Sequence, residues 1–372
     1  MATKRRGIHA TNLNFRPNVQ NCGTETKGTK PTCGPTSIKE ILTLTVLHVC
    51  KKSLFFDTNL KVAIYLGSLF IISLIADVLP FPKVYLSRSD NIFNRLFVKF
   101  SWAWNLALLI PFVLLTSLIY CCGDRVKVAK LHMLRLGIAT FFWYFWTSMF
   151  NYIEASYGKC GNVTFTTKTS CLLEGHVWNG FDLSGHSLIL IYGSLVIIEE
   201  TRCIVNWDCI KEHLRLEDHY RATRETTPNS NPLRNLSDAQ LRYLKENYEK
   251  FTPYIRGLLV AIALLQFLWD IMLLCTMLYY HIMIEKFLGG LAAILTWFAT
   301  YRFWYNLPNM LPRMPGEGDF RYMKTISPPV EPIGRVRRTN SITESQGPMF
   351  MGRPIYAKLG RDREENNVVA SS

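Results

Sequence analysis

The chain has 372 residues, of which 49% are hydrophobic and 19% are charged. Soluble domains carry about 25% charged residues, and here the apolar residues are gathered into long runs. This pattern excludes secreted disulfide scaffolds, cytosolic dinucleotide-binding enzymes and disordered regulators. The formal net charge is +14, which in a membrane protein marks cytosolic loops and anionic lipid surfaces. We therefore predict an all-α integral membrane protein that binds no nucleic acid.

In chain order, residues 1–54 form a basic cytosolic segment, whose apolar run 38–50 is too short to span and predicts an interfacial helix. Residues 55–306 form the membrane domain. A crossing takes about 20 apolar residues, and six segments meet this requirement. They are residues 60–79, 98–120, 131–153, 184–205, 255–280 and 287–305. Residues 307–372 are rich in Pro, Gly and Arg and predict a disordered, basic cytosolic tail.

Charge and glycosylation signals orient these spans. The loop of residues 202–256 is rich in Lys and Arg, which places it in the cytosol. The loop of residues 154–182 has few basic residues and carries the acceptor sequence Asn162-Val163-Thr164, so Asn162 is expected to bear a glycan in the lumen. A second acceptor at Asn235 lies in the basic loop and should stay unmodified. These signals favour six transmembrane helices with both termini in the cytosol.

The ten cysteines show no paired metal-binding spacing, so we expect no metal site and no cofactor. Cys160 and Cys171 lie in the expected lumenal loop. The sequence leaves open whether they form a disulfide or remain free thiols.

Two of the eight histidines occupy matching positions. His186 begins the fourth span and His281 ends the fifth, both at the lumenal end. Ionisable groups in a membrane domain are functional by default, and two at one depth can face each other across a small site. The alternative is that both are interfacial histidines at headgroup level.

The neighbours of His186 predict a helix start. Ser184 or Asp182 can cap the helix, and Gly185 permits close backbone approach. The free N–H groups of such a helix start favour an anion such as phosphate.

His281 is followed by a carboxylate at i+4, Glu285. If the helix continues, this spacing puts both side chains on one face. A carboxylate bonded to one ring nitrogen fixes the tautomer and makes the other nitrogen more nucleophilic. If residues 281–285 are instead the turn itself, Asp182 becomes the alternative partner.

Ser184-Gly185-His186 and the spacing His281-xxx-Glu285 resemble the second and third motifs of membrane lipid phosphate phosphatases. Residues 178–186 (WNGFDLSGH), together with residues 281–305, look more closely like the fat storage-inducing transmembrane family. The resemblance covers about residues 55–306. It implies a six-span hydrolase of the endoplasmic reticulum membrane that acts on an acid anhydride. The orientation of the spans predicts that its active site is lumenal. The substrate is fatty acyl-CoA, which is cleaved to acyl 4′-phosphopantetheine and adenosine 3′,5′-bisphosphate.

The family is also associated with triacylglycerol and diacylglycerol binding and with lipid-droplet formation. Neutral glycerides and lipids of the endoplasmic reticulum membrane are therefore expected partners besides acyl-CoA. The alternative function is that of a non-catalytic glyceride-binding protein that partitions neutral lipid into droplets, with histidines that only hold the helices together.

By position, the resemblance makes His281 the nucleophile that attacks phosphorus and His186 the acid that protonates the leaving oxygen. Glu285 takes the place of the phosphatases' Asp. The phosphatases' first motif, with its Lys and Arg, is absent, and Leu274-Cys275 stands where the third motif has Ser-Arg. Phosphoryl transfer depends on cations that neutralise developing charge. Candidates by lumenal position alone are Lys286, Lys83 and Arg88.

Two acidic residues lie deeper in the expected spans. Asp270 and Glu200 are each about 16 Å or more of helix rise from the histidines. We expect them to pack against polar partners inside the helix bundle, with binding of a glyceride headgroup as the alternative.

Overall fold

A computed structural model of the chain describes residues 38–79, 81–82, 84–88, 90–161, 167–223, 231–308, 310–322, 349–350 and 353–354. The chain divides into two compact units, residues 1–326 and residues 327–372. In the second unit, the described residues form an antiparallel pair of short strands, β3 (Met349–Phe350) and β4 (Arg353–Pro354). The first unit is mostly helical.

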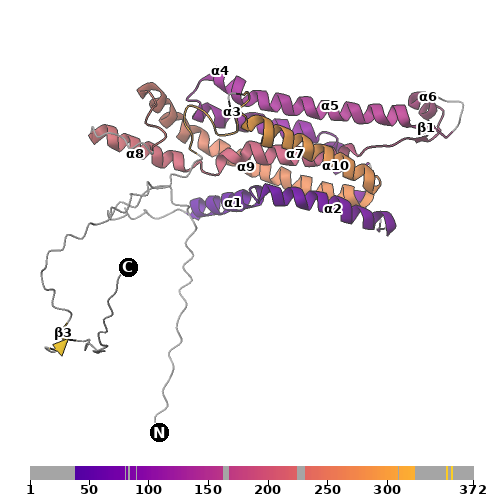
Figure 1. Cartoon of the computed structure of the whole chain (residues 1–372), viewed down its shortest axis with the longest axis horizontal. Coiled ribbons are helices and arrows are strands. Elements are labelled where there is room, and N and C mark those ends of the chain that lie inside the picture. The colour runs from indigo at the N-terminus through magenta and orange to yellow at the C-terminus, as the bar shows by residue number, and fades with distance from the viewer. Residues whose placement is uncertain are drawn as a thin grey trace, which may run out of the picture. The chain divides into compact units, whose positions relative to one another are not determined.

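Long helices form the body of the first unit (Figure 1). They are α1 (Ile38–Leu54), α2 (Thr58–Val78), α3 (Ser101–Tyr120), α5 (Leu134–Tyr157), α7 (Gly185–Thr201), α9 (Asp238–Tyr279) and α10 (Met283–Trp297). The shorter elements are α4 (Arg125–Lys127), α6 (Lys168–Leu173), α8 (Cys209–Thr223), β1 (Lys159–Cys160), β2 (Trp178–Asn179), η1 (Tyr85–Ser87), η2 (Phe93–Val98), η3 (Val128–Met133), η4 (Arg202–Ile204), η5 (Phe298–Phe303) and η6 (Trp304–Asn306). In Figure 1, α6 and β1 lie at one end of α5 and α4 lies at the other.

Each of the six segments expected to cross the bilayer contains a long helix. Among the described residues, four helices are long and apolar enough to span a membrane. They are Thr58–Val78, Ser101–Tyr120, Asp238–Tyr279 and Met283–Asn306. Of the other two, α7 has only 17 residues and α5 mixes polar with aromatic side chains. The chain is therefore a mostly helical, multi-pass membrane protein, and six crossings stay a prediction.

α7 is the central helix, since every residue from Ser187 to Thr201 is buried. Small residues let its neighbours approach closely. A Cβ on Gly193 would lie 2.3 Å from Asn105 Nδ2 of α3, and a Cβ on Gly290 of α10 would lie 3.1 Å from Ile191 Cδ1 of α7. α7 is thus held tightly against α3 and α10, which fixes the position of His186 at its first turn.

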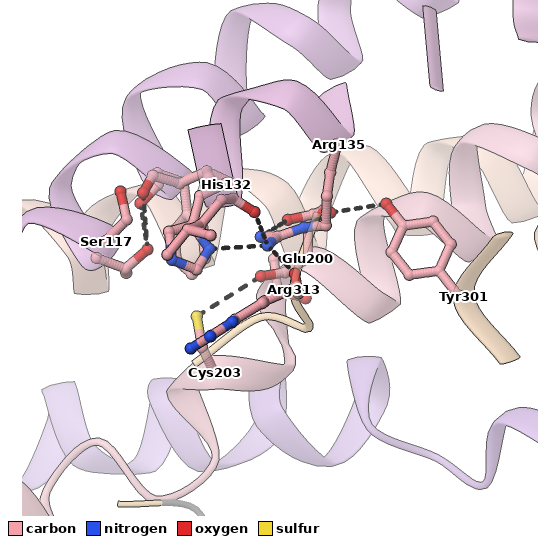
Figure 2. Close-up of polar contacts among 12 residues, drawn as sticks. Ser117, His132, Arg135, Glu200, Cys203, Tyr301 and Arg313 are labelled. Atoms are coloured by element: carbon pink, nitrogen blue, oxygen red, sulfur yellow. Dashed lines mark hydrogen bonds and ion pairs between the residues drawn. The ribbon is translucent and has the colours of Figure 1, made fainter. Parts of the chain in front are cut away.

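A buried ion pair joins α5 to α7 (Figure 2). Arg135 Nε and Nη2 donate to the two carboxylate oxygens of Glu200, each at 2.7 Å, and the Tyr301 hydroxyl donates to the same carboxylate at 2.7 Å. Arg135 Nη1 also donates to the Arg313 carbonyl at 2.6 Å. Polar partners inside the bundle were expected for Glu200, and this expectation is confirmed.

Asp270 likewise has polar partners, two from α2 and one from its own helix α9. It accepts from the Tyr65 hydroxyl at 2.6 Å and from Gln266 Nε2 at 3.0 Å, and it lies 3.6 Å from Lys61 Nζ. Because the Asp270 side chain is 40% exposed, these contacts only partly enclose it.

Arg135→Ala is expected to lower the free energy of unfolding by about 3–5 kcal/mol, because it leaves the Glu200 carboxylate buried without its cation. Tyr301→Phe removes one hydrogen bond to the charged carboxylate and should cost about 1.5–3 kcal/mol. Thermal unfolding of the purified variants in detergent measures both. Arg215→Ala, at an exposed pair with Glu212, is the matched control and should leave the transition unchanged. Equal midpoints for Arg135→Ala and Arg215→Ala would contradict a structural role for the buried pair.

The chain after α10 stays on the bundle for longer than the sequence indicates. Phe320 and Tyr322 are buried, and the Tyr322 hydroxyl donates to the Cys203 carbonyl at 2.8 Å. Lys127 Nζ donates to Asp319 at 2.5 Å. Residues 310–322 therefore belong to the first unit and pack against its helices, although the tail is expected to begin at residue 307. The remainder of that tail, apart from the two strands, lies outside the described residues.

α1 covers the apolar run that predicts an interfacial helix. Its large apolar residues Ile38, Ile41, Leu42, Leu44, Val46 and Val49 are exposed. The helix itself is confirmed, and its position in the membrane interface stays a prediction.

Candidate active site

The first turn of α7 is fixed by Ser184, which is fully buried. Its hydroxyl oxygen accepts from the Ser187 N–H at 3.3 Å, so Ser184 is the N-cap and Asp182 is not. Within the described part of the chain, the N–H groups of Gly185 and His186 donate no hydrogen bond. The first turn thus presents free donors beside His186.

Backbone contacts join this turn to the start of α10. The Ser184 N–H donates to the Glu285 carbonyl at 3.3 Å, and the Ser187 hydroxyl donates to the Lys286 carbonyl at 3.0 Å. A Cβ on Gly289 would lie 2.6 Å from the Ser184 carbonyl oxygen, whereas one on Gly185 would meet no atom within 4 Å. The close approach that is expected at Gly185 therefore falls at Gly289, and Gly185 borders open space.

His281 lies between two helices. α9 ends at Tyr279 and α10 begins at Met283, while His281 has φ +56°. A residue with a side chain adopts this left-handed conformation only at a cost, and such strain concentrates at functional sites. The sequence left open whether the helix continues or turns at residues 281–285, and the structure has a turn between α9 and α10.

The turn nevertheless brings two carboxylates to the same ring nitrogen. His281 Nδ1 lies 3.4 Å from Glu285 Oε2 and 3.5 Å from Asp182 Oδ2. Glu285 also accepts from the Ile282 N–H at 3.4 Å, so it caps the start of α10. Glu285 and Asp182, the two alternative partners of His281, therefore both lie near Nδ1. This leaves Nε2 as the ring nitrogen that can act as a nucleophile.

His186 and His281 lie side by side, with ring centroids 6.3 Å apart. Tyr280 stacks on His186 at 6.0 Å, and its hydroxyl donates to the Arg88 carbonyl at 2.9 Å. Tyr280 is a site residue that the sequence motifs do not single out. Its only signal is its position next to His281.

Contacts of Asp77 and Lys286, which we call the Asp77–Lys286 latch, hold the turn of residues 280–286 in place. Asp77 of α2 accepts from the Met283 N–H at 2.7 Å and lies 3.8 Å from Lys286 Nζ. Lys286 is 1% exposed and donates to the Met277 carbonyl at 2.8 Å. The Lys286 ammonium therefore bonds to the end of α9 and faces Asp77, so it is poorly placed to hold a phosphate. Arg88 is exposed; Lys83 and the acceptor Asn162 lie outside the described residues.

The loop that precedes α7 is closed by a disulfide between Cys160 and Cys171. β1 and β2 pair antiparallel beside it. Trp178 Nε1 donates to the Glu154 carbonyl at the end of α5, at 3.1 Å. This loop thus ties the end of α5 to the segment that carries Asp182 and Ser184.

The two carboxylates can be separated by amide variants measured side by side. Glu285→Gln should lower turnover by about 10- to 100-fold, the value of a hydrogen bond to a charged group, with little change in substrate binding. Asp182→Asn should cost less, because the Asp182 side chain is 54% exposed against 12% for Glu285 and solvent screens its charge. Release of product by the purified variants measures the difference. Impairment of Asp182→Asn alone would contradict the role given to Glu285.

Comparison with known proteins places this geometry in a family. The family model described as "Fat storage-inducing transmembrane protein" matches residues 82–301, which include His186 and His281. An acyl-coenzyme A diphosphatase of Drosophila melanogaster is 50% identical over 395 residues, covering 96% of this chain and 93% of the relative. Human and zebrafish (Danio rerio) proteins of the same name are 32% and 33% identical, covering 63% and 65% of this chain and 78% and 84% of the relatives. No solved structure matches the chain. The chain belongs to the fat storage-inducing transmembrane family.

Proposed function

We propose that this protein is a fatty acyl-CoA diphosphatase of the endoplasmic reticulum membrane, which supports lipid-droplet formation and lipid homeostasis there. The observation that carries the proposal is the pairing of His186 with His281, at 6.3 Å between ring centroids, with two carboxylates at His281 Nδ1. Relatives named acyl-coenzyme A diphosphatase, one of them 50% identical over nearly the whole chain, support it.

The reaction follows from the roles of the two rings. His281 Nε2 attacks one phosphorus of the diphosphate, and the bond from that phosphorus to the bridging oxygen breaks. His186 donates a proton to the departing oxygen. Water then attacks the phosphorus on His281, His186 takes the proton of the water, and His281 is released. One water is consumed, and the products are acyl 4′-phosphopantetheine and adenosine 3′,5′-bisphosphate.

The two carboxylates stabilise the positive charge that His281 acquires in the reaction. Attack through Nε2 leaves the His281 ring positively charged, and the carboxylates of Glu285 and Asp182 lie within 3.5 Å of its Nδ1. Fixed negative charge at the position where positive charge develops lowers the barrier without reorganisation.

Purified protein in detergent tests the proposal. We expect time-dependent release of adenosine 3′,5′-bisphosphate from oleoyl-CoA. No release from folded protein would favour the alternative of a non-catalytic protein that binds triacylglycerol or diacylglycerol and partitions neutral lipid into droplets.

The proposed arrangement in the membrane has six crossings, both termini in the cytosol and the histidine site in the lumen. The membrane domain would take in residues 55–306, between a cytosolic segment of residues 1–54 and the tail. The disulfide between Cys160 and Cys171 supports this orientation, because disulfides persist in the oxidising lumen and are rare in the cytosol.

Glycan mapping checks the orientation. We expect endoglycosidase to shift the mobility of wild-type protein and of Asn235→Gln, and to leave Asn162→Gln unchanged, since only lumenal acceptors are modified. A glycan on Asn235, which is exposed in the structure, would reverse the orientation and with it the lumenal site.

A further inference from the structure

The histidine site contains an electrostatic conflict if its substrate is a diphosphate. Asp182 and Glu285 place two carboxylates within 3.5 Å of His281 Nδ1, and the CoA diphosphate is itself multiply negative. Phosphoryl transfer needs cations around the equatorial oxygens. Lys286 cannot serve, since its ammonium is buried against the Met277 carbonyl and Asp77.

The register of α3 against α7 identifies another cation at the same end of the bundle. Trp102 of α3 stacks on Tyr192 of α7, with ring centroids 5.6 Å apart. Three residues further along α3, Asn105 meets Gly193, the residue that follows Tyr192 on α7, so the contacts advance in the same direction along both helices. Lys99 precedes Trp102 by about 4.5 Å of helix rise, and His186 precedes Tyr192 by about 9 Å.

Lys99 and His186 therefore lie at neighbouring starts of adjacent helices. The difference in height is about 4.5 Å, which is within the reach of a lysine side chain with its four-carbon stem.

The Lys99 side chain is available for a ligand. It is exposed, and within the described segments its ammonium makes no ion pair and no hydrogen bond. At the start of the adjacent helix, the first turn of α7 offers the N–H groups of Gly185 and His186, and a Cβ on Gly185 would meet open space. An oxygen anion between these donors and Lys99 would be neutralised from two sides.

We infer that Lys99 is the cation that holds a non-bridging oxygen of the substrate diphosphate beside His186. The inference rests on the proposed function and adds the cation that the motifs do not supply. An ammonium serves here as a point charge, so arginine is a tolerable replacement and a neutral side chain is not.

The experiment compares Lys99→Gln, Lys99→Arg and the control Lys159→Gln for release of adenosine 3′,5′-bisphosphate from oleoyl-CoA. Lys159 is exposed on β1, so its replacement removes the same charge from the same end of the bundle. We expect kcat/KM to fall about 100-fold in Lys99→Gln, the effect of losing one transition-state donor. Lys99→Arg should stay within about 10-fold of wild type, and Lys159→Gln should be unchanged. Added adenosine 3′,5′-bisphosphate should inhibit Lys99→Gln more weakly than wild type.

The outcomes separate this inference from the proposed function. An inactive His281→Ala beside a fully active Lys99→Gln would overturn the role of Lys99 alone. So would equal losses in Lys99→Gln and Lys159→Gln, or a Lys99→Arg variant no better than Lys99→Gln. Wild-type rates in folded His281→Ala would instead overturn the proposed function. Gel filtration of each variant verifies folding, which an exposed lysine should not affect.

Discussion

Replacing His281 with alanine is expected to reduce release of adenosine 3′,5′-bisphosphate from oleoyl-CoA to the assay background. No other described group at the site combines an imidazole with carboxylate partners at 3.4 and 3.5 Å, so the variant has no nucleophile to replace it. The measurement is initial rate with purified protein in detergent.

His281 occupies a strained turn, so its replacement must be separated from misfolding. Gel filtration and thermal unfolding of the variant provide the control. Among the described residues, the His281 ring forms no hydrogen bond or ion pair with Asp77 or Lys286, so its loss should leave the unfolding midpoint close to that of wild type. A well-folded His281→Ala with wild-type turnover would exclude the enzymatic account and favour the glyceride-binding alternative.

His186→Ala should lower turnover by about 10²–10⁴-fold, the usual cost of a lost general acid. The ring lies beside His281 and stacks on Tyr280, at the free N–H groups of the α7 start, where a departing oxygen can be protonated. The nucleophile remains in this variant, so a residual rate above that of His281→Ala is expected.

The pH dependence of the remaining activity distinguishes an acid from a merely structural ring. A general acid acts only while protonated, so the wild-type rate should fall as the pH rises through the pKa of that acid. This alkaline limb should disappear in His186→Ala, because no such proton remains to be lost. An unchanged pH profile at a lower rate would contradict the assignment of His186 as the acid.

The positions of the helices were predictable because each expected crossing is a long apolar run bounded by polar residues. The same holds for the pairing of His186 with His281, since both fall at helix ends on one side of the bundle. Glu200 was also assigned its environment correctly, because a carboxylate within an apolar helix needs a buried partner.

The details of the site were less predictable. A continued helix and a turn are both compatible with the spacing from His281 to Glu285. The turn is held by Asp77 of α2, which accepts from the Met283 N–H, and by Lys286 of α10, which donates to the Met277 carbonyl. Lys99 is invisible to motif reasoning for a related reason. The position that we infer for Lys99 beside His186 depends on the register of α3 against α7, which is set by tertiary contacts of Trp102 and Asn105.

The ends of the membrane domain illustrate the same limit. α9 begins at Asp238 with a capping box from Ser237, well before the apolar run at residue 255, because its charged first half packs against the bundle. Residues 310–322 look like tail in composition, yet Phe320 and Tyr322 are buried. The composition of a segment does not show which surface of the protein the segment packs against.

The central claim is that the site cleaves the diphosphate bond of acyl-CoA, and product analysis in ¹⁸O-labelled water tests it most directly. Purified protein is incubated with oleoyl-CoA, and the products are quantified by mass spectrometry. We predict equal amounts of oleoyl 4′-phosphopantetheine and adenosine 3′,5′-bisphosphate, with one ¹⁸O in the phosphate of one product and none in a carboxylate. Labelled free oleate together with intact CoA would show thioester hydrolysis instead and would contradict the account.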